Sequence, residues 1–71
     1  MSEIIEIRDG EEFIKLSQAL KKAGIAGTGA EAKMLVRSGG IRVNGEAEDR
    51  PGRKLVSGDL FVLENREYRI R

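Results

Sequence analysis

At residue 40 the pattern of apolar and polar residues changes from a helical period to an alternating one. Two stretches before that point, 13–23 and 28–38, place apolar residues at the three- and four-residue spacing of an amphipathic helix. The stretches after it alternate apolar and polar residues, as half-buried strands do. With a strand before the first helix, the predicted order is β-α-α-β-β-β. We therefore expect an α+β fold in which a helical hairpin packs on one side of a small antiparallel sheet.

A strand and a helix are predicted in the first third of the sequence. Ile4–Arg8 is rich in branched residues and indicates a short strand. Asp9, with Glu12 three residues later, is typical of a helix start in which Asp9 is the N-cap. Gly24 is expected to end this first helix.

The second helix is predicted to begin at Thr28 and to end at Gly39. Thr28 followed by Glu31 matches the capping box. Only about four residues join the two helices, which indicates a tight helical hairpin or helix-turn-helix unit. Gly27 and Gly29 flank the cap, and free backbone N–H groups at a helix N-terminus favour an anion such as phosphate. The alternative interpretation is that these glycines only turn the chain.

A β-hairpin and further strands are predicted in the second half. Asn44-Gly45 is the strongest short signal for a type I′ hairpin turn, and it follows the alternating stretch 41–44. Since Ile41 and Val43 face the core, Arg42 and Asn44 are expected on the opposite face. The remaining strands are expected at 54–56, 60–64 and 67–71, with a short one near 46–48 and turns at 57–58 and 65–66.

The composition excludes several kinds of chemistry. The 71 residues contain no cysteine and no histidine, which excludes disulfides, thiol chemistry, a Cys/His zinc site and a histidine base. No two carboxylates are placed to act as a catalytic pair. We expect a single domain over 1–71 that is not an enzyme and takes no cofactor, metal or small-molecule substrate. Without a membrane-spanning run or a signal-peptide pattern, a cytoplasmic monomer that makes no membrane contact is expected.

The net charge of +1 conceals a polarised distribution of charge. Residues 1–32 carry four cations and six acids, whereas residues 33–71 carry nine cations and six acids. Gly29, Lys33 and Arg37 are spaced at i, i+4 and i+8 and so share one face of the second helix. Arg42 follows on the next strand. This grouping suggests a basic surface that the total charge does not reveal.

Further positively charged residues follow the hairpin turn, namely Arg50, Arg53 and Lys54. Acidic residues 46, 48 and 49 are expected on the exposed hairpin, so the basic patch requires that they point away or pair locally.

Few aromatic residues accompany these cations. Phe13 and Phe61 are expected in the core and Tyr68 half-buried, which leaves no aromatic platform for unstacked bases. Any RNA is therefore expected to be folded or double-stranded and to be recognised by backbone charge and shape.

Four pieces of the sequence, in order, resemble a known family. They are LKKAG at 20–24, TGAEAK at 28–33, GIRVNG at 40–45 and VSGDL at 56–60. The stretch 13–63 that contains them resembles the S4 domain, an RNA-binding module named after the fourth small-subunit ribosomal protein. Within that family, the runs 27–33 and 50–55 look most like the small stand-alone proteins of the YaaA/YbcJ type.

The resemblance implies an RNA-binding surface of the αL type, formed by the second helix and the hairpin after it. It implies non-catalytic binding of structured RNA, on ribosomal RNA or a ribosomal particle, in ribosome assembly or quality control in a bacterial cytoplasm. The residues expected to contact or frame RNA are Thr28, Gly29, Lys33, Arg37, Arg42, Asn44, Arg50, Arg53 and Lys54. Many family members have arginine directly after the capping residue, where this chain has Gly29. That phosphate contact is lost here, so either backbone amides replace it or the affinity is lower.

Three alternatives remain at this point. A winged helix-turn-helix would bind DNA, but Ala30, Ala32 and Met34 are poor base-reading side chains and a third helix is not predicted. A KH-type module has a GxxG between helices, as at 24–27, but its basic pair and third helix are absent. A protein-interaction module on the ribosome would use the strand at 67–71 as an exposed sheet edge.

Overall fold

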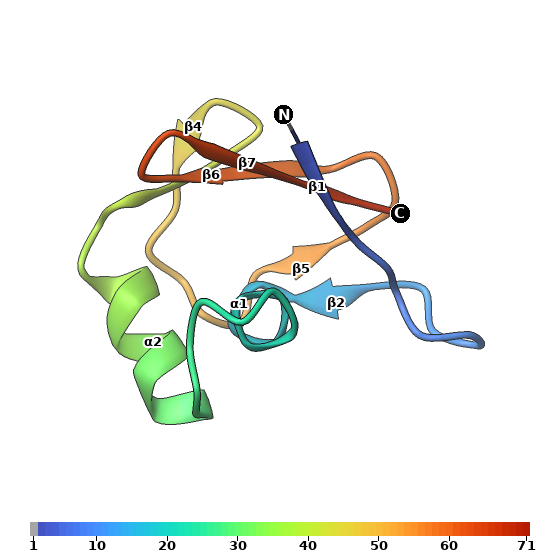
Figure 1. The fold of residues 1–71 in the computed structure, drawn as a ribbon, viewed down its shortest axis with the longest axis horizontal. Helices are drawn as coiled ribbons and strands as arrows, with labels where there is room; N and C mark the ends of the chain where they lie inside the picture. Colours follow the sequence, from blue (N-terminus) through green and yellow to red (C-terminus); the bar gives the residue numbers. More distant parts are fainter. Residues whose placement is uncertain (1) are drawn as a thin grey trace.

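Five strands form the main sheet, and both helices lie on one of its faces (Figure 1). The computed structural model describes residues 2–71. The strand order is β1-β7-β6-β3-β4, with β1 at Ser2–Ile5, β7 at Arg66–Ile70, β6 at Leu60–Leu63, β3 at Ile41–Val43 and β4 at Glu46–Ala47. A helical hairpin packed on a small sheet confirms the predicted α+β fold class.

The N-terminal strand makes this sheet mixed, so the prediction of a purely antiparallel sheet is wrong. β1 pairs with β7 in parallel, with Ile5 beside Ile70, whereas the other neighbouring strands are antiparallel. β7 therefore lies between β1 and β6, and the prediction that Glu67–Arg71 forms an exposed edge is wrong. The sequence pattern shows that a segment is a strand, but the pairing partner depends on contacts across the whole length of the chain.

The first helix begins later than predicted. α1 spans Leu16–Lys22, and a two-residue strand, β2 (Ile14–Lys15), precedes it. Asp9 lies in a turn, so the predicted N-cap at this position is wrong. The reason is a long-range contact: β2 pairs with β5 (Lys54–Leu55), which places two buried apolar side chains in a second small sheet. The pairing of β2 with β5 outweighs the local sequence pattern that indicated a helix start at Asp9.

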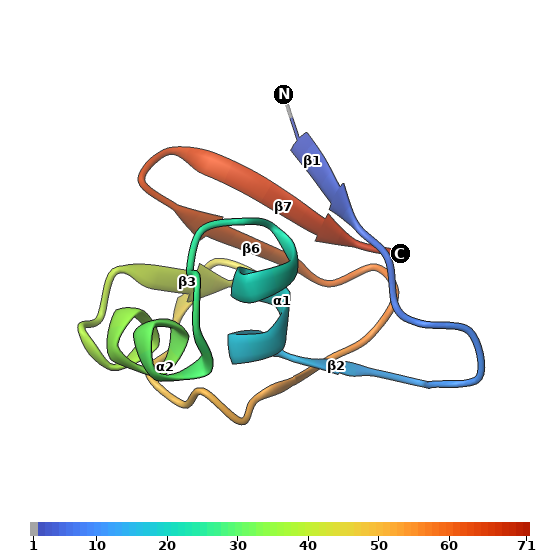
Figure 2. The same cartoon turned by 60° about the horizontal axis from the view of Figure 1, so that its bottom comes forward.

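The loop between β4 and β5 closes the N-terminal end of α1. The backbone N–H groups of Leu16 and Ser17 donate to the carbonyls of Arg53 (2.8 Å) and Pro51 (3.0 Å). Such N–H groups have no partner inside a helix, so the distant loop satisfies them. In both ribbon views this loop passes beside the second helix on its way to α1 (Figures 1 and 2). The loop that carries two of the predicted cations is thus fixed to the helical hairpin.

The second helix forms as predicted. α2 spans Gly29–Arg37, and the Thr28 hydroxyl oxygen accepts a hydrogen bond from the Glu31 N–H (3.1 Å). Gly39 follows the helix with a φ of +88°, a left-handed conformation that ends helices and suits glycine. Local signals were sufficient here because the cap and the end of the helix both lie within the segment itself.

Residues from both helices and all the longer strands form one hydrophobic core between the helices and the sheet. Phe61 and Tyr68 stack at its centre, with ring centroids 4.8 Å apart, and both are fully buried. Phe61 confirms the prediction, whereas Tyr68 is more deeply buried than expected. Phe13 is only partly buried and lies outside the core cluster, so the prediction that it belongs to the core is wrong. The Asn44-Gly45 turn has positive φ at both residues (51° and 86°), which confirms the type I′ hairpin.

Candidate nucleic-acid interface

The outward face of α2 carries two cations and a methionine. Lys33 and Arg37, one turn apart, are both exposed, as the sequence predicted. Neither side chain makes an ion pair with any residue that the structure describes. Ala30 and Met34 are exposed on the same side of the helix. The buried side of α2 is formed by Ala32 and Val36, so the helix is held by one face and presents the other to solvent.

The N-terminal end of α2 already holds a carboxylate. Glu31 lies in the first turn, and its Oε2 accepts a hydrogen bond from the Gly27 N–H at 2.9 Å. This negative charge lies where the helix dipole favours an anion. Of the two interpretations of this glycine-rich loop, the geometry favours capping, because Thr28 and Glu31 between them occupy the N–H groups of Glu31 and Gly27.

Arg42 lies on a different face from the α2 cations. Ile41 and Val43 are buried in the core between the sheet and the helices, so Arg42 projects from the outer face of the sheet. Its neighbours in register are Ala47 on β4 and Val62 on β6. The structure therefore separates Arg42 from Lys33 and Arg37, with which the sequence pattern groups it.

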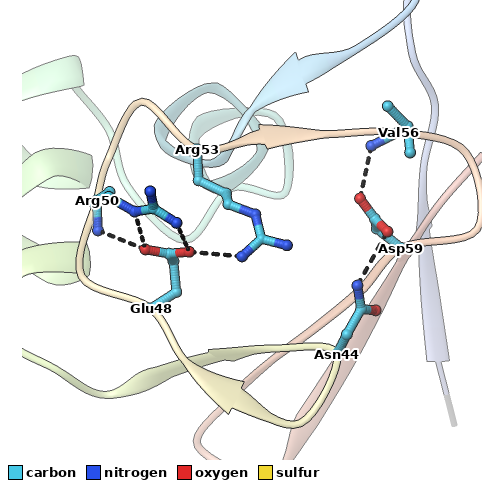
Figure 3. Close-up of polar contacts among 6 residues, drawn as sticks. All are labelled: Asn44, Glu48, Arg50, Arg53, Val56 and Asp59. Carbon is cyan, nitrogen blue, oxygen red and sulfur yellow. Dashed lines mark hydrogen bonds and ion pairs between the residues drawn. The ribbon is translucent and has the colours of Figure 1, made fainter.

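Two more predicted cations form a cluster around a buried carboxylate (Figure 3). Glu48 is 5% exposed, so the expectation that it lies on an exposed hairpin is wrong. The Arg50 Nε donates to Glu48 Oε2 at 2.9 Å, and Arg53 donates to Glu48 Oε1 at 2.8 Å. The Arg50 backbone N–H also donates to Glu48 Oε2, at 3.1 Å. Glu48 thus pairs locally with Arg50 and Arg53, as the predicted basic patch required. The same pairing neutralises part of the positive charge of that patch.

These contacts fix the ionisation of the cluster. Hydrogen bonds from Arg50 and Arg53 lower the pKa of Glu48 from its ordinary 4.5 to about 2, against an opposing effect of burial. The same contact raises the pKa of Arg50. Two guanidinium groups and one carboxylate leave a net charge of +1. The Arg50 side chain is 72% exposed and that of Arg53 is 30% exposed, so both still reach the surface.

Asn44 links two turns that are distant in the sequence (Figure 3). Its Nδ2 donates to Asp59 Oδ1 at 3.1 Å, and its Oδ1 accepts from the Leu60 N–H at 3.0 Å. Asp59 Oδ2 in turn accepts from the Val56 N–H at 2.8 Å. This arrangement, here called the Asn44–Asp59 latch, joins the Asn-Gly turn to the Gly-Asp turn. The side-chain amide of Asn44, a predicted RNA-contacting residue, is therefore hydrogen-bonded within the protein. In the sequence, the Gly58-Asp59 turn indicates the position of its partner.

Lys54 lies beside Lys15 in the β2–β5 pair and takes no part in the ion pairs of Glu48. It is on β5, and its Nζ stands 4.8 Å from the centre of the Phe13 ring, a cation–π contact. The structure thus distributes the predicted residues over several places. Thr28, Gly29, Lys33 and Arg37 belong to α2 and its cap, Arg50 and Arg53 to the adjoining loop, and Arg42, Asn44 and Lys54 to other parts of the surface.

A shallow cleft on the surface was not predicted. It has a volume of about 420 Å³ and is lined by residues of α1, of β2 and of the chain before β2: Arg8, Glu11, Ile14, Gln18, Lys21 and Lys22. Both acidic and basic side chains line it, and it is open to solvent. In the part of the chain that the structure describes, no group of three or more acidic side chains is placed to hold a metal ion. No helix there is long and apolar enough to cross a membrane.

The fold and the exposed cations define a small α+β module whose basic surface is formed by a capped helix and an adjoining loop. The chain belongs to the S4 domain family, whose sequence profile matches residues 5–71. It is also similar to a protein described as a probable ribosome maturation protein RlbA from Bacillus subtilis (strain 168). The two are 40% identical over 53 residues, which cover 75% of each chain. These comparisons confirm the resemblance found in the sequence.

Proposed function

We propose that this protein binds structured RNA without catalysing a reaction, and that ribosomal RNA or a ribosomal particle is its partner. The observation that carries the proposal is the pair Lys33 and Arg37, exposed on one face of α2 and without ion-pair partners among the residues that the structure describes. Unpaired cations at that spacing are suited to neighbouring phosphates. The name of the relative, a ribosome maturation protein, supports a role in ribosome assembly or quality control in the bacterial cytoplasm.

The binding surface is expected to include α2 and the loop beside it. Lys33 and Arg37 supply free charges, and the exposed edges of the Arg50 and Arg53 guanidinium groups add donors held at fixed positions by Glu48. Contacts with two to four phosphates would give a slope of roughly −2 to −4 when the logarithm of affinity is plotted against that of salt concentration. Thr28 frames this surface through the cap of α2.

The test is a salt titration of RNA binding by a charge-deleted variant. We expect Lys33→Ala combined with Arg37→Ala to weaken binding of a folded ribosomal RNA transcript and to make the salt slope shallower by up to about 2. The matched control is Arg8→Ala with Lys21→Ala, which removes two exposed cations that line the cleft beside α1. Equal losses in both variants, or a salt-independent affinity of the wild type, would contradict the proposal.

Duplex DNA in the same titration separates RNA binding from the DNA-binding alternative. A helix that reads the major groove should present several base-contacting side chains. The exposed face of α2 offers Ala30 and Met34 beside its two cations. We expect folded RNA to compete more strongly than duplex DNA at equal salt, and the reverse order would favour a DNA-binding function.

A further inference from the structure

Met34 is the most exposed of the large apolar side chains that the structure describes. It is 72% exposed, compared with 46% for Ile4 and 48% for Val56. It lies in the middle of α2 but does not contribute to the core, because the buried residues of this helix are Ala32 and Val36. Arg37, three residues further on, is its neighbour on the helix surface, so an apolar group and a positive charge lie side by side on the exposed face of α2.

The charges around Met34 are asymmetric. At about 100° per residue, Arg37 lies roughly 60° and Lys33 roughly 100° to one side of Met34 around the helix axis. Glu31 lies roughly 60° to the other side, where its carboxylate is fixed to the Gly27 N–H. A polyanion is therefore attracted along one flank of the methionine and repelled along the other. This face suits a ligand with one strand of phosphates along the cationic side. The ligand should also have an apolar surface beside that strand, next to Met34.

We propose that Met34 packs against the riboses of one strand of double-stranded RNA, at the minor-groove edge, while Lys33 and Arg37 contact phosphates of the same strand. This inference rests on the proposed RNA-binding function and adds an apolar contact by Met34 and the edge of the duplex that it meets. The minor groove of A-form RNA is wide and shallow and exposes its riboses, so a convex helix face can approach them. Methionine is unbranched and flexible, which suits an irregular surface of sugar carbons.

Other nucleic acids fit this face less well. Unpaired bases are bound mainly by stacking on aromatic rings, and no aromatic residue lies on α2. The minor groove of B-form DNA is narrow and does not admit a helix. The contribution of Met34 is apolar, so it should not depend on salt, whereas the contributions of Lys33 and Arg37 should.

The experiment compares Met34→Gln with the wild type on an RNA duplex of 16–20 base pairs and on a DNA duplex of the same sequence. Gln is similar in length and is also a good helix former, and an exposed position should leave the melting temperature unchanged. Burial of part of the methionine corresponds to an affinity loss of about three- to tenfold on RNA. The salt slope should stay that of the wild type, and the loss on DNA should be smaller.

Val56→Thr is the control, because Val56 is also exposed but lies in the loop after β5. Its affinity for the RNA duplex should equal that of the wild type. Three results would overturn the inference: unchanged RNA affinity in Met34→Gln, an equal loss on DNA, or an altered salt slope. If the wild type binds no RNA at low salt, the proposed function itself fails, and this outcome is distinct from a wild type that binds while the variant matches it.

Discussion

Replacing Glu48 with glutamine is expected to destabilise the protein by about 2 kcal/mol at neutral pH. The two arginines lower the pKa of this carboxyl group from 4.5 to about 2, and a change of that size corresponds to roughly 3 kcal/mol in favour of the folded carboxylate. Because the Arg50 side chain is 72% exposed, water screens part of the interaction, and the expected loss is smaller. Glutamine keeps the shape of the side chain but turns an N–H₂ group toward guanidinium donors.

The stabilisation by Glu48 has a defined pH range. Its pKa is lower in the folded protein than in the unfolded chain, so the carboxylate stabilises the fold fully above pH 4.5. As the pH falls below 4.5, the carboxyl group of the unfolded chain becomes protonated while the folded one stays ionised, so this contribution decreases. It is lost once the pH reaches about 2, where the folded carboxylate is protonated as well. The difference in unfolding free energy between the wild type and Glu48→Gln should therefore be constant at neutral pH and decrease through that acidic range.

Urea denaturation at a series of pH values, followed by circular dichroism, measures this difference. At neutral pH the variant should also melt about 10 °C below the wild type, given the size of the domain. Glu46→Gln is the control, since Glu46 is exposed on β4, two residues before Glu48. The reasoning is refuted if both variants are equally stable, or if the stability difference for Glu48→Gln does not change between pH 4.5 and pH 2.

Two further predictions concern the latch and the helix cap. Asn44→Gly keeps the positive φ but removes both side-chain hydrogen bonds, so we expect a loss of about 1–2 kcal/mol, whereas Asn44→Ala should lose about 1 kcal/mol more through strain at φ 51°. Thermal denaturation tests both, and a glycine variant as stable as the wild type would contradict the role of the latch. Thr28→Ala should cost about 1 kcal/mol and speed hydrogen exchange at the Glu31 amide; unchanged exchange there would contradict the cap.

The sequence determined those parts whose causes are local. The cap at Thr28 and the helix after it follow from residues within one segment, and the Asn44-Gly45 hairpin needs only two residues that accept positive φ. The exposure of Lys33 and Arg37 followed in the same way from helical spacing. A helix or a hairpin is specified by neighbours in the chain, so a pattern of a few residues is enough to predict it.

The tertiary structure alone decided which distant segments meet. The pairing of β2 with β5 moved the start of α1 away from Asp9, and the parallel pairing of β1 with β7 turned a predicted edge strand into an internal one. For the same reason, some of the predicted site residues do not lie together in the structure. Arg42 projects from the outer face of the sheet, and Asn44 is engaged by Asp59, fifteen residues further along the chain. These contacts depend on long-range packing, which the spacing of residues along the chain does not encode.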